Sequence, residues 1–114
     1  MISHIVLFTP RVALAPAQKA AIVDRLQTAI AACPTVRACR VGRRIRHGLP
    51  GYEQQMADDY QFSLILEFDD VEGLKEYLQN PAHAGIGGLF TSAASASLAY
   101  DYELVDLASA GTLL

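Results

Sequence analysis

One histidine follows a motif that starts helices, which gives it a defined electrostatic environment. Asn80 and Pro81 form a pair typical of a helix start, with Asn80 as the cap and Pro81 at the first position. His83 is then expected at the third position of that helix. The positive end of the helix dipole disfavours imidazolium there and favours a neutral ring. A general base requires a neutral imidazole, so His83 is the candidate base; the alternative is a histidine that only caps the helix or packs against the sheet.

Two further residues are candidates for polarising a carbonyl oxygen. Tyr77 precedes the candidate base by six residues and is able to donate a hydrogen bond to an enolate or a carbonyl oxygen; alternatively it is an aromatic core residue. His4 alternates with Val6 and Phe8 and therefore shares their face. If the residues between them face the helices, this face points into a barrel interior, and Val6 and Phe8 are predicted ligand contacts. The alternative for His4 is a half-solvated strand end.

Two charged residues complete the candidate ligand site. Glu67 lies on the mixed face of an alternating strand and could orient a histidine, or it is a solvated carboxylate at a strand end. Arg43 falls on the apolar face of its strand and could meet an acidic substrate. Arginines also lie along surfaces with their stems buried, which is the alternative for Arg43.

Several kinds of site have no matching pattern. The three histidines and the two cysteines, Cys33 and Cys39, have no recognised metal-ligand spacing. No glycine-rich phosphate loop follows the first apolar run, and no Gly-x-Ser-x-Gly sequence occurs. A net charge of −3 gives no overall basic field for nucleic acid, and the arginines between 37 and 46 lack interleaved aromatic residues. We therefore expect no cofactor, no metal and no nucleic-acid partner, which leaves cofactor-free proton transfer or simple binding.

The 114 residues are expected to form one domain, 1–114. Periodic apolar residues predict strands at 2–8, 36–46, 60–68 and 98–105, with a loop at 47–59. Helices are predicted at 16–33, from a cap at Asp69, and over a shorter segment from Pro81 that glycines at 85, 87 and 88 weaken. The order βαββαβ is the ferredoxin-like arrangement, an α+β fold with helices on one face of an antiparallel sheet.

The other face of such a sheet needs a cover. The first strand is apolar at every position from Ile5 to Phe8. Each large apolar side chain left in water forgoes roughly 1.5–3 kcal/mol. Two copies packed face to face avoid this cost, so we expect a homodimer unless residues 107–114 cover the face. No run approaches 18 apolar residues and the start lacks a secretory pattern, so a cytoplasmic protein with no membrane partner is expected.

Three segments together resemble the stress-responsive dimeric A/B barrel (Dabb) family. They are His4-Ile5-Val6-Leu7-Phe8, the strand Phe62 to Phe68, and Tyr77-Leu78-Gln79-Asn80-Pro81-Ala82-His83. The resemblance extends to about Glu103 and implies a dimeric α+β barrel in which two sheets face each other. In the cyclase branch of that family, the matching positions, here His4, Tyr77 and His83, line the pocket.

The leading hypothesis is a small-molecule-binding homodimer of this type with an apolar or carbonyl-containing ligand. If it is an enzyme, it would be a cofactor-independent lyase, cyclase or isomerase, with His83 as base and with His4 and Tyr77 polarising the oxygen. A second hypothesis is a non-catalytic stress or structural dimer whose interior is filled by side chains. A third is a cofactor-free monooxygenase, because such enzymes use the same dimeric architecture.

Overall fold

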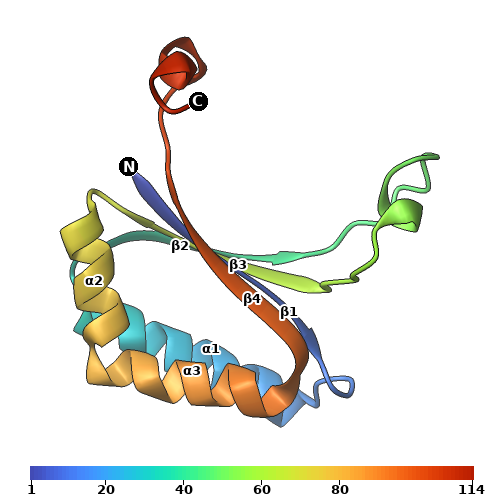
Figure 1. Cartoon of the computed structure of the whole chain (residues 1–114). Helices are drawn as coiled ribbons and strands as arrows, with labels where there is room; N and C mark the ends of the chain where they lie inside the picture. Colours follow the sequence, from blue (N-terminus) through green and yellow to red (C-terminus); the bar gives the residue numbers. More distant parts are fainter.

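The computed structural model covers residues 1–114 and describes every side chain except those of Leu89 and Thr91. Its elements follow the order β1 (Ile2–Pro10), α1 (Pro16–Ala32), β2 (Val36–Arg43), η1 (Glu53–Gln55), β3 (Phe62–Phe68), α2 (Val71–Gln79), α3 (Pro81–Ala93), β4 (Ala94–Glu103) and η2 (Leu107–Thr112). The strands form one antiparallel sheet in the order β2-β3-β1-β4, and the helices lie on one side of it (Figure 1). The predicted ferredoxin-like α+β fold is confirmed.

Strand β1 lies inside the sheet, and its register decides which of its residues meet the helices. His4 is directly opposite Leu66 of β3, and Val6 is opposite Leu64. Leu64 and Leu66 are buried in the main hydrophobic core, and directly opposed residues share a face. His4, Val6 and Phe8 therefore face the helices. The condition set for His4 in the sequence analysis, that Ile5 and Leu7 face the helices, is therefore not met. A strand that is apolar on both faces carries no signal for which face is covered.

The predicted boundaries of the first two helices are correct to within two residues. Helix α1 begins at Pro16, as expected, and ends just before Cys33-Pro34. Helix α2 begins one residue later than a cap at Asp69 would place it, because Asp70 is the cap and accepts a 2.8 Å hydrogen bond from the Gly73 amide. Asp69 instead pairs with Arg37 at 2.8 Å.

Helix α3 begins as predicted, but it is longer than the short helix that the sequence analysis expected. The Asn80 side chain accepts a 2.9 Å hydrogen bond from the Ala82 amide, and Pro81 occupies the first position. The helix has thirteen residues including Pro81, and the chain then turns directly into β4. Strand β4 begins at Ala94, earlier than predicted, because its first residues pair with Thr9 and Pro10 at the end of β1.

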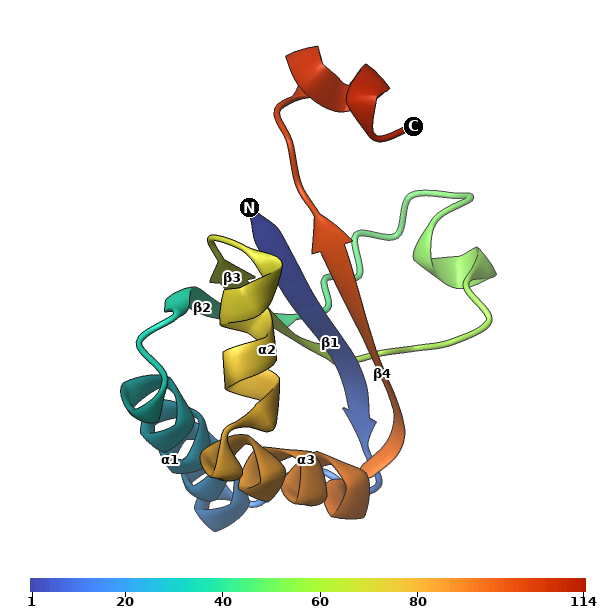
Figure 2. The same cartoon turned by 60° about the vertical axis from the view of Figure 1, so that its left-hand side comes forward.

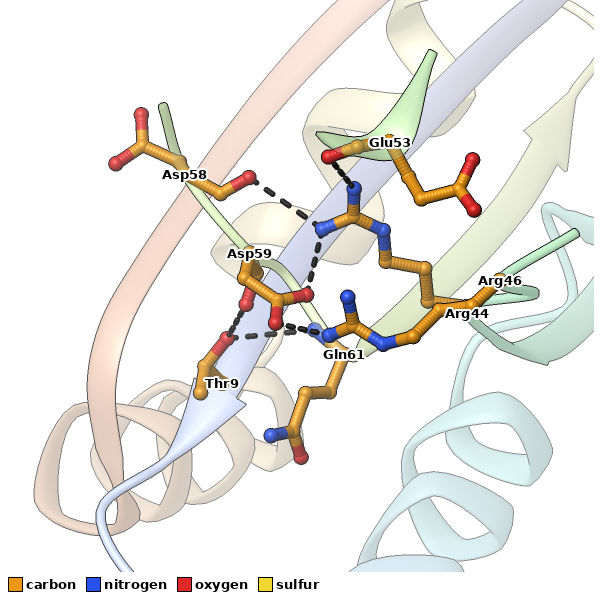
Figure 3. Close-up of polar contacts among 7 residues, drawn as sticks. All are labelled: Thr9, Arg44, Arg46, Glu53, Asp58, Asp59 and Gln61. Atoms are coloured by element: carbon orange, nitrogen blue, oxygen red, sulfur yellow. Dashed lines mark hydrogen bonds and ion pairs between the residues drawn. The ribbon is translucent and has the colours of Figure 1, made fainter. Parts of the chain in front are cut away.

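Strand β2 ends at Arg43, three residues earlier than predicted, and the loop beyond it is fixed by charged groups (Figure 3). Arg44 donates to the Asp59 carboxylate at 2.5 Å, and Arg46 pairs with the same carboxylate. The Thr9 hydroxyl donates to the Asp59 carbonyl at 2.5 Å. The loop is therefore tied to the end of β1 while most of its length extends away from the helices (Figure 1).

The face of the sheet opposite the helices carries apolar side chains. Tyr100 is opposite Ile5 across the β1–β4 pair, and Tyr102 is opposite Ser3. Tyr100 is 57% exposed and Tyr102 is 49% exposed. The C-terminal segment with η2 leaves beyond the end of β4 and does not lie over this face (Figures 1 and 2). Among the described residues, no helix is long and apolar enough to cross a membrane.

Candidate functional site

A cavity of about 390 Å³ lies between the helix-facing side of the sheet and helices α2 and α3. Its walls come from β1, β3, β4, α2 and α3. The side chains of His4, Tyr77 and His83 all line it, so the structure brings together the three residues selected from the sequence. Their rings form a chain of contacts, with centroids 6.1 Å apart for His4 and Tyr77 and 4.8 Å apart for Tyr77 and His83.

Tyr77 lies buried at the centre of this group. It is 1% exposed and packs its ring against Phe68 at a centroid distance of 5.5 Å. Burial, with smaller contributions from Cys39 and Cys33, raises the pKa of Tyr77 to about 12. The phenol therefore stays protonated near neutral pH, where it is able to donate a hydrogen bond but not to act as a base.

His83 occupies the third position of α3, as predicted, and its environment favours the neutral imidazole. Partial burial lowers the pKa of His83 below its usual 6.5, and the nearby His4 acts in the same direction. A hydrogen bond with the Leu78 backbone acts against both and only moderates the pKa shift. Near neutral pH the imidazole is thus uncharged and able to accept a proton. The opposite pKa shifts make Tyr77 the hydrogen-bond donor and His83 the proton acceptor of the pair.

His4 has a carboxylate partner that the sequence analysis did not assign. The Nδ1 atom of His4 lies 2.6 Å from the Asp101 Oδ1 atom. His4 is 6% exposed, whereas the Asp101 side chain is 44% exposed. A carboxylate on one ring nitrogen fixes the orientation of the ring and leaves Nε2 for other chemistry. Nothing in the sequence reveals that β4 pairs with β1 in the register that puts Asp101 opposite His4.

The remaining predicted contacts divide into two groups. Val6 lines the cavity. Phe8 does not line it, but its ring packs on Phe90, a lining residue, at a centroid distance of 4.7 Å. Glu67 and Arg43 do not line it. Glu67 alternates with buried Leu66 and so lies on the uncovered face, where it pairs with Arg40 at 3.2 Å.

Arg43 lies two strands away from β1 and is exposed. It lines a separate groove of about 520 Å³, together with Tyr60 and Phe62. Neither Glu67 nor Arg43 therefore lines the cavity with the histidines. Glu67 lies on the opposite face of the sheet, and Arg43 lies on β2, two strands away from β1. Among the described residues, no group of three or more His, Cys, Asp or Glu side chains is arranged to hold a metal ion.

The sequence matches the model of the stress responsive A/B barrel domain (Dabb) over residues 2–104. The chain belongs to the Dabb family. No curated protein matches this Dabb domain significantly. Solved structures with the same fold include a dimeric ferredoxin-like protein of unknown function from Thermobifida fusca, at 23% identity and a TM-score of 0.68, covering 90% of both chains.

Two structural neighbours of this Dabb domain are described as enzymes. The hydroxynitrile lyase of Passiflora edulis is 17% identical with a TM-score of 0.76, and the match covers 92% of this chain and 94% of the lyase. SnoaB of Streptomyces nogalater, described as a cofactor-independent oxygenase, is 14% identical with a TM-score of 0.66, covering 92% of this chain and 93% of SnoaB. At these identities the likeness establishes the shared fold of the Dabb domain.

Proposed function

We propose that this Dabb protein binds a small carbonyl compound in the cavity between its helices and sheet and catalyses cofactor-free proton transfer on it. The observation that carries the proposal is the convergence of one neutral base, one protonated donor and one carboxylate-oriented imidazole on a single cavity of about 390 Å³. A cavity of that volume suits one small organic ligand. The mixture of an apolar wall with a few polar groups is typical of such sites.

The reaction follows from the protonation states. His83, as the neutral base, removes a proton from the carbon next to the carbonyl group. The electron pair left behind forms an enolate, whose oxygen accepts a hydrogen bond from the Tyr77 phenol. His4 donates its Nδ1 proton to the Asp101 carboxylate, so its Nε2 atom is an acceptor and serves as a relay for the proton. Return of the proton to another atom completes an isomerisation, and attack of the enolate on a second carbonyl completes a cyclisation.

The alternative of a purely structural dimer required an interior filled by side chains. The cavity, together with the position of both histidines on its wall, favours a binding function instead. The fold is also used by proteins described as a lyase and as a cofactor-independent oxygenase. An oxygenase would consume oxygen in proportion to product, so an oxygen electrode distinguishes this third possibility from proton transfer.

Proton exchange tests the proposal without a known substrate. Methyl ketones are incubated with the protein in D₂O, and incorporation of deuterium next to the carbonyl is followed by proton NMR. We expect exchange above the buffer rate for the wild type, with loss of most of the excess rate in His83→Ala and in Tyr77→Phe. Lys19→Ala, on the outer surface of α1, is the control. Exchange that is undiminished in His83→Ala would show that His83 is not the base.

We also propose that the protein is a homodimer formed through the uncovered face of the sheet. Ile5, Ile65 and Tyr100 form one row across three strands on this face, and the C-terminal segment leaves it open. A protein of the same fold from Thermobifida fusca is described as dimeric. Sedimentation velocity should show a dimer for the wild type and a monomer for Tyr100→Asp. A wild-type monomer at high micromolar concentration would contradict the dimer.

A further inference from the structure

The residues that follow β4 form a segment that the rest of the subunit does not cover, and we call residues 104–114 the C-terminal arm. The arm is joined to the sheet at its first residue, where the Leu104 amide donates to the Met1 carbonyl at 2.8 Å. Beyond this point the hydrogen bonds of the described residues join the arm only to itself, as in the 2.9 Å bond from the Ser109 amide to the Asp106 carbonyl. The arm therefore extends away from its own subunit as a hook around η2 (Figures 1 and 2).

The C-terminal arm is apolar although it is exposed. Its large apolar side chains are Leu104, Val105, Leu107, Leu113 and Leu114. Its single charged side chain is that of Asp106, and Leu107 is 91% exposed. Apolar side chains in water lose free energy that packing on another surface recovers, and exposed groups gathered on one segment mark an interaction site.

A groove of about 520 Å³ at the loop end of the sheet has a matching apolar surface. Leu7, Met56, Tyr60 and Phe62 supply most of its apolar lining. Leu7 alternates with the helix-facing residues of β1 and therefore lies on the uncovered face of the sheet. The groove is thus continuous with the face through which the homodimer is proposed to form.

The charged groups of the groove and the arm are complementary. Arg43, Arg44 and Asp58 line the groove, and Arg44 is already paired with Asp59 at 2.5 Å. Arg43 forms no ion pair with any described residue of its own subunit, and neither does Asp106 of the arm. The arm therefore carries a free carboxylate beside its leucines, and the groove carries a free guanidinium beside its aromatic rings.

The arm lies at the wrong end of the sheet to fill the groove of its own subunit. Glu103 is opposite Ile2 at the start of β1, whereas Leu98 is opposite Leu7 near its end. At about 3.3 Å per residue, the groove is about 17 Å along the strand from the base of the arm. The arm continues in the other direction (Figure 1). A second copy whose strands run in the opposite sense across the uncovered face brings its arm to the groove.

We propose that the C-terminal arm of one subunit packs in this groove of a second copy of the chain, and that the second copy's arm packs in the groove of the first. Two-fold symmetry makes the two contacts identical. The inference rests on the proposed homodimer, and it adds the surface that each arm occupies and the relative direction of the two sheets.

NMR of mixed dimers tests the contact directly in the unaltered chain. Chains labelled with ¹³C are unfolded and refolded together with unlabelled chains, and a filtered NOE experiment detects only contacts between a labelled and an unlabelled chain. We expect such contacts from the Leu107 methyl groups to the ring protons of Tyr60 and Phe62. The methyl groups of Val23, exposed on α1 at the other side of the sheet, are the control and should show none. Contacts of Leu107 confined to its own chain, or to residues outside the groove of the partner, would overturn the proposal.

A substitution in the arm measures its share of the dimer affinity. Leu107→Asp leaves the subunit intact because the side chain is exposed, and it places a charge in the apolar contact. In fluorescence-detected sedimentation velocity, Leu107→Asp should raise the dimer dissociation constant about tenfold or more. Val23→Asp makes the same kind of change at an exposed residue of α1 and should leave the dissociation constant as in the wild type. An equal dissociation constant for Leu107→Asp and Val23→Asp would refute the arm contact.

Tyr100→Asp separates failure of this inference from failure of the proposed homodimer. If Tyr100→Asp is a monomer while Leu107→Asp dissociates as the wild type does, the homodimer holds and the role of the arm is refuted. If Leu107→Asp weakens the dimer but Tyr100→Asp does not, the arm contact holds and the uncovered face is not the interface. If the wild type is a monomer at high micromolar concentration, both are refuted.

Discussion

Removal of the Asp101 carboxylate should destabilise the fold, because it leaves a buried histidine nitrogen without its partner. His4 is 6% exposed, and its Nδ1 atom lies 2.6 Å from Asp101. Leaving a buried polar group unsatisfied costs about 1–3 kcal/mol. The Asp101 side chain is 44% exposed, so water reaches this part of the site and the upper end of that range is excluded. We expect Asp101→Ala to lower the free energy of unfolding by about 2 kcal/mol.

Asp101→Asn tests the charge separately from the hydrogen bond. The amide oxygen of asparagine still accepts from Nδ1, but a neutral acceptor gives a weaker bond than a carboxylate. The expected loss is about 1 kcal/mol, roughly half that of the alanine variant. Glu103→Ala is the matched control, because Glu103 is two residues further on the same strand, shares the same face and is exposed. A surface substitution of that kind should change stability by less than about 0.5 kcal/mol.

Urea unfolding at pH 7 measures these differences, with one protein concentration for all variants because dimer formation would shift the midpoint. A positioning role also predicts a change in the histidine ring itself. Long-range proton–nitrogen NMR should show His4 protonated on Nδ1 in the wild type and a mixture of tautomers in Asp101→Ala. The reasoning is refuted if Asp101→Ala is as stable as Glu103→Ala and keeps the wild-type tautomer.

Three further outcomes are expected. His83 has a lowered pKa when folded, so the unfolded chain binds the proton first as pH falls below about 6.5, and stability falls with it; the melting temperature of His83→Gln should fall less than that of the wild type between pH 7 and 5.5. Tyr77→Phe should remove an absorbance step near pH 12 at 295 nm while keeping the melting temperature, whereas Tyr77→Ala should cost about 3–5 kcal/mol because its ring is core. Asp59→Ala should speed amide hydrogen exchange in the loop that Arg44 and Arg46 fix to Asp59, without changing ketone binding in the cavity; protection equal to that of the wild type would show that the ion pairs do not hold the loop.

The helices could be predicted from the sequence because their ends carry residues that strongly favour helix termini. Pro16 and Pro34 bound α1, and Asn80 with Pro81 places the start of α3 to the residue. At α2 the same logic selected Asp69 although Asp70 is the cap. Two adjacent aspartates are equally able to accept from an amide three residues on, so only the backbone geometry decides between them.

The candidate site could be predicted from the sequence only in part, because its residues meet through the pairing of strands that are distant in the sequence. His83 could be placed at the third helix position from local sequence. The sequence analysis attributed a lowered pKa of His83 to the helix dipole, whereas in the structure burial and the nearby His4 lower it. Asp101 is 97 residues from His4, and its contact depends on the pairing of the first and last strands. The alternation of β1 also left open which face meets the helices, since Val6 and Leu7 are equally apolar. The site therefore combines side chains from both ends of the chain, and no short stretch of the sequence holds all of them.

The two faces of β1 link the proposed dimer to the proposed chemistry without making one depend on the other. His4 and Val6 form part of the cavity on one side of this strand, and Ile5 and Leu7 lie on the uncovered side. The described residues that line the cavity belong to β1, β3, β4, α2 and α3 of one subunit. Strand β1 is also hydrogen-bonded on both edges, to β3 and β4, which holds His4 opposite Asp101 within each subunit. Dimerisation then contributes burial of the open face, and a soluble monomeric variant should retain ketone binding.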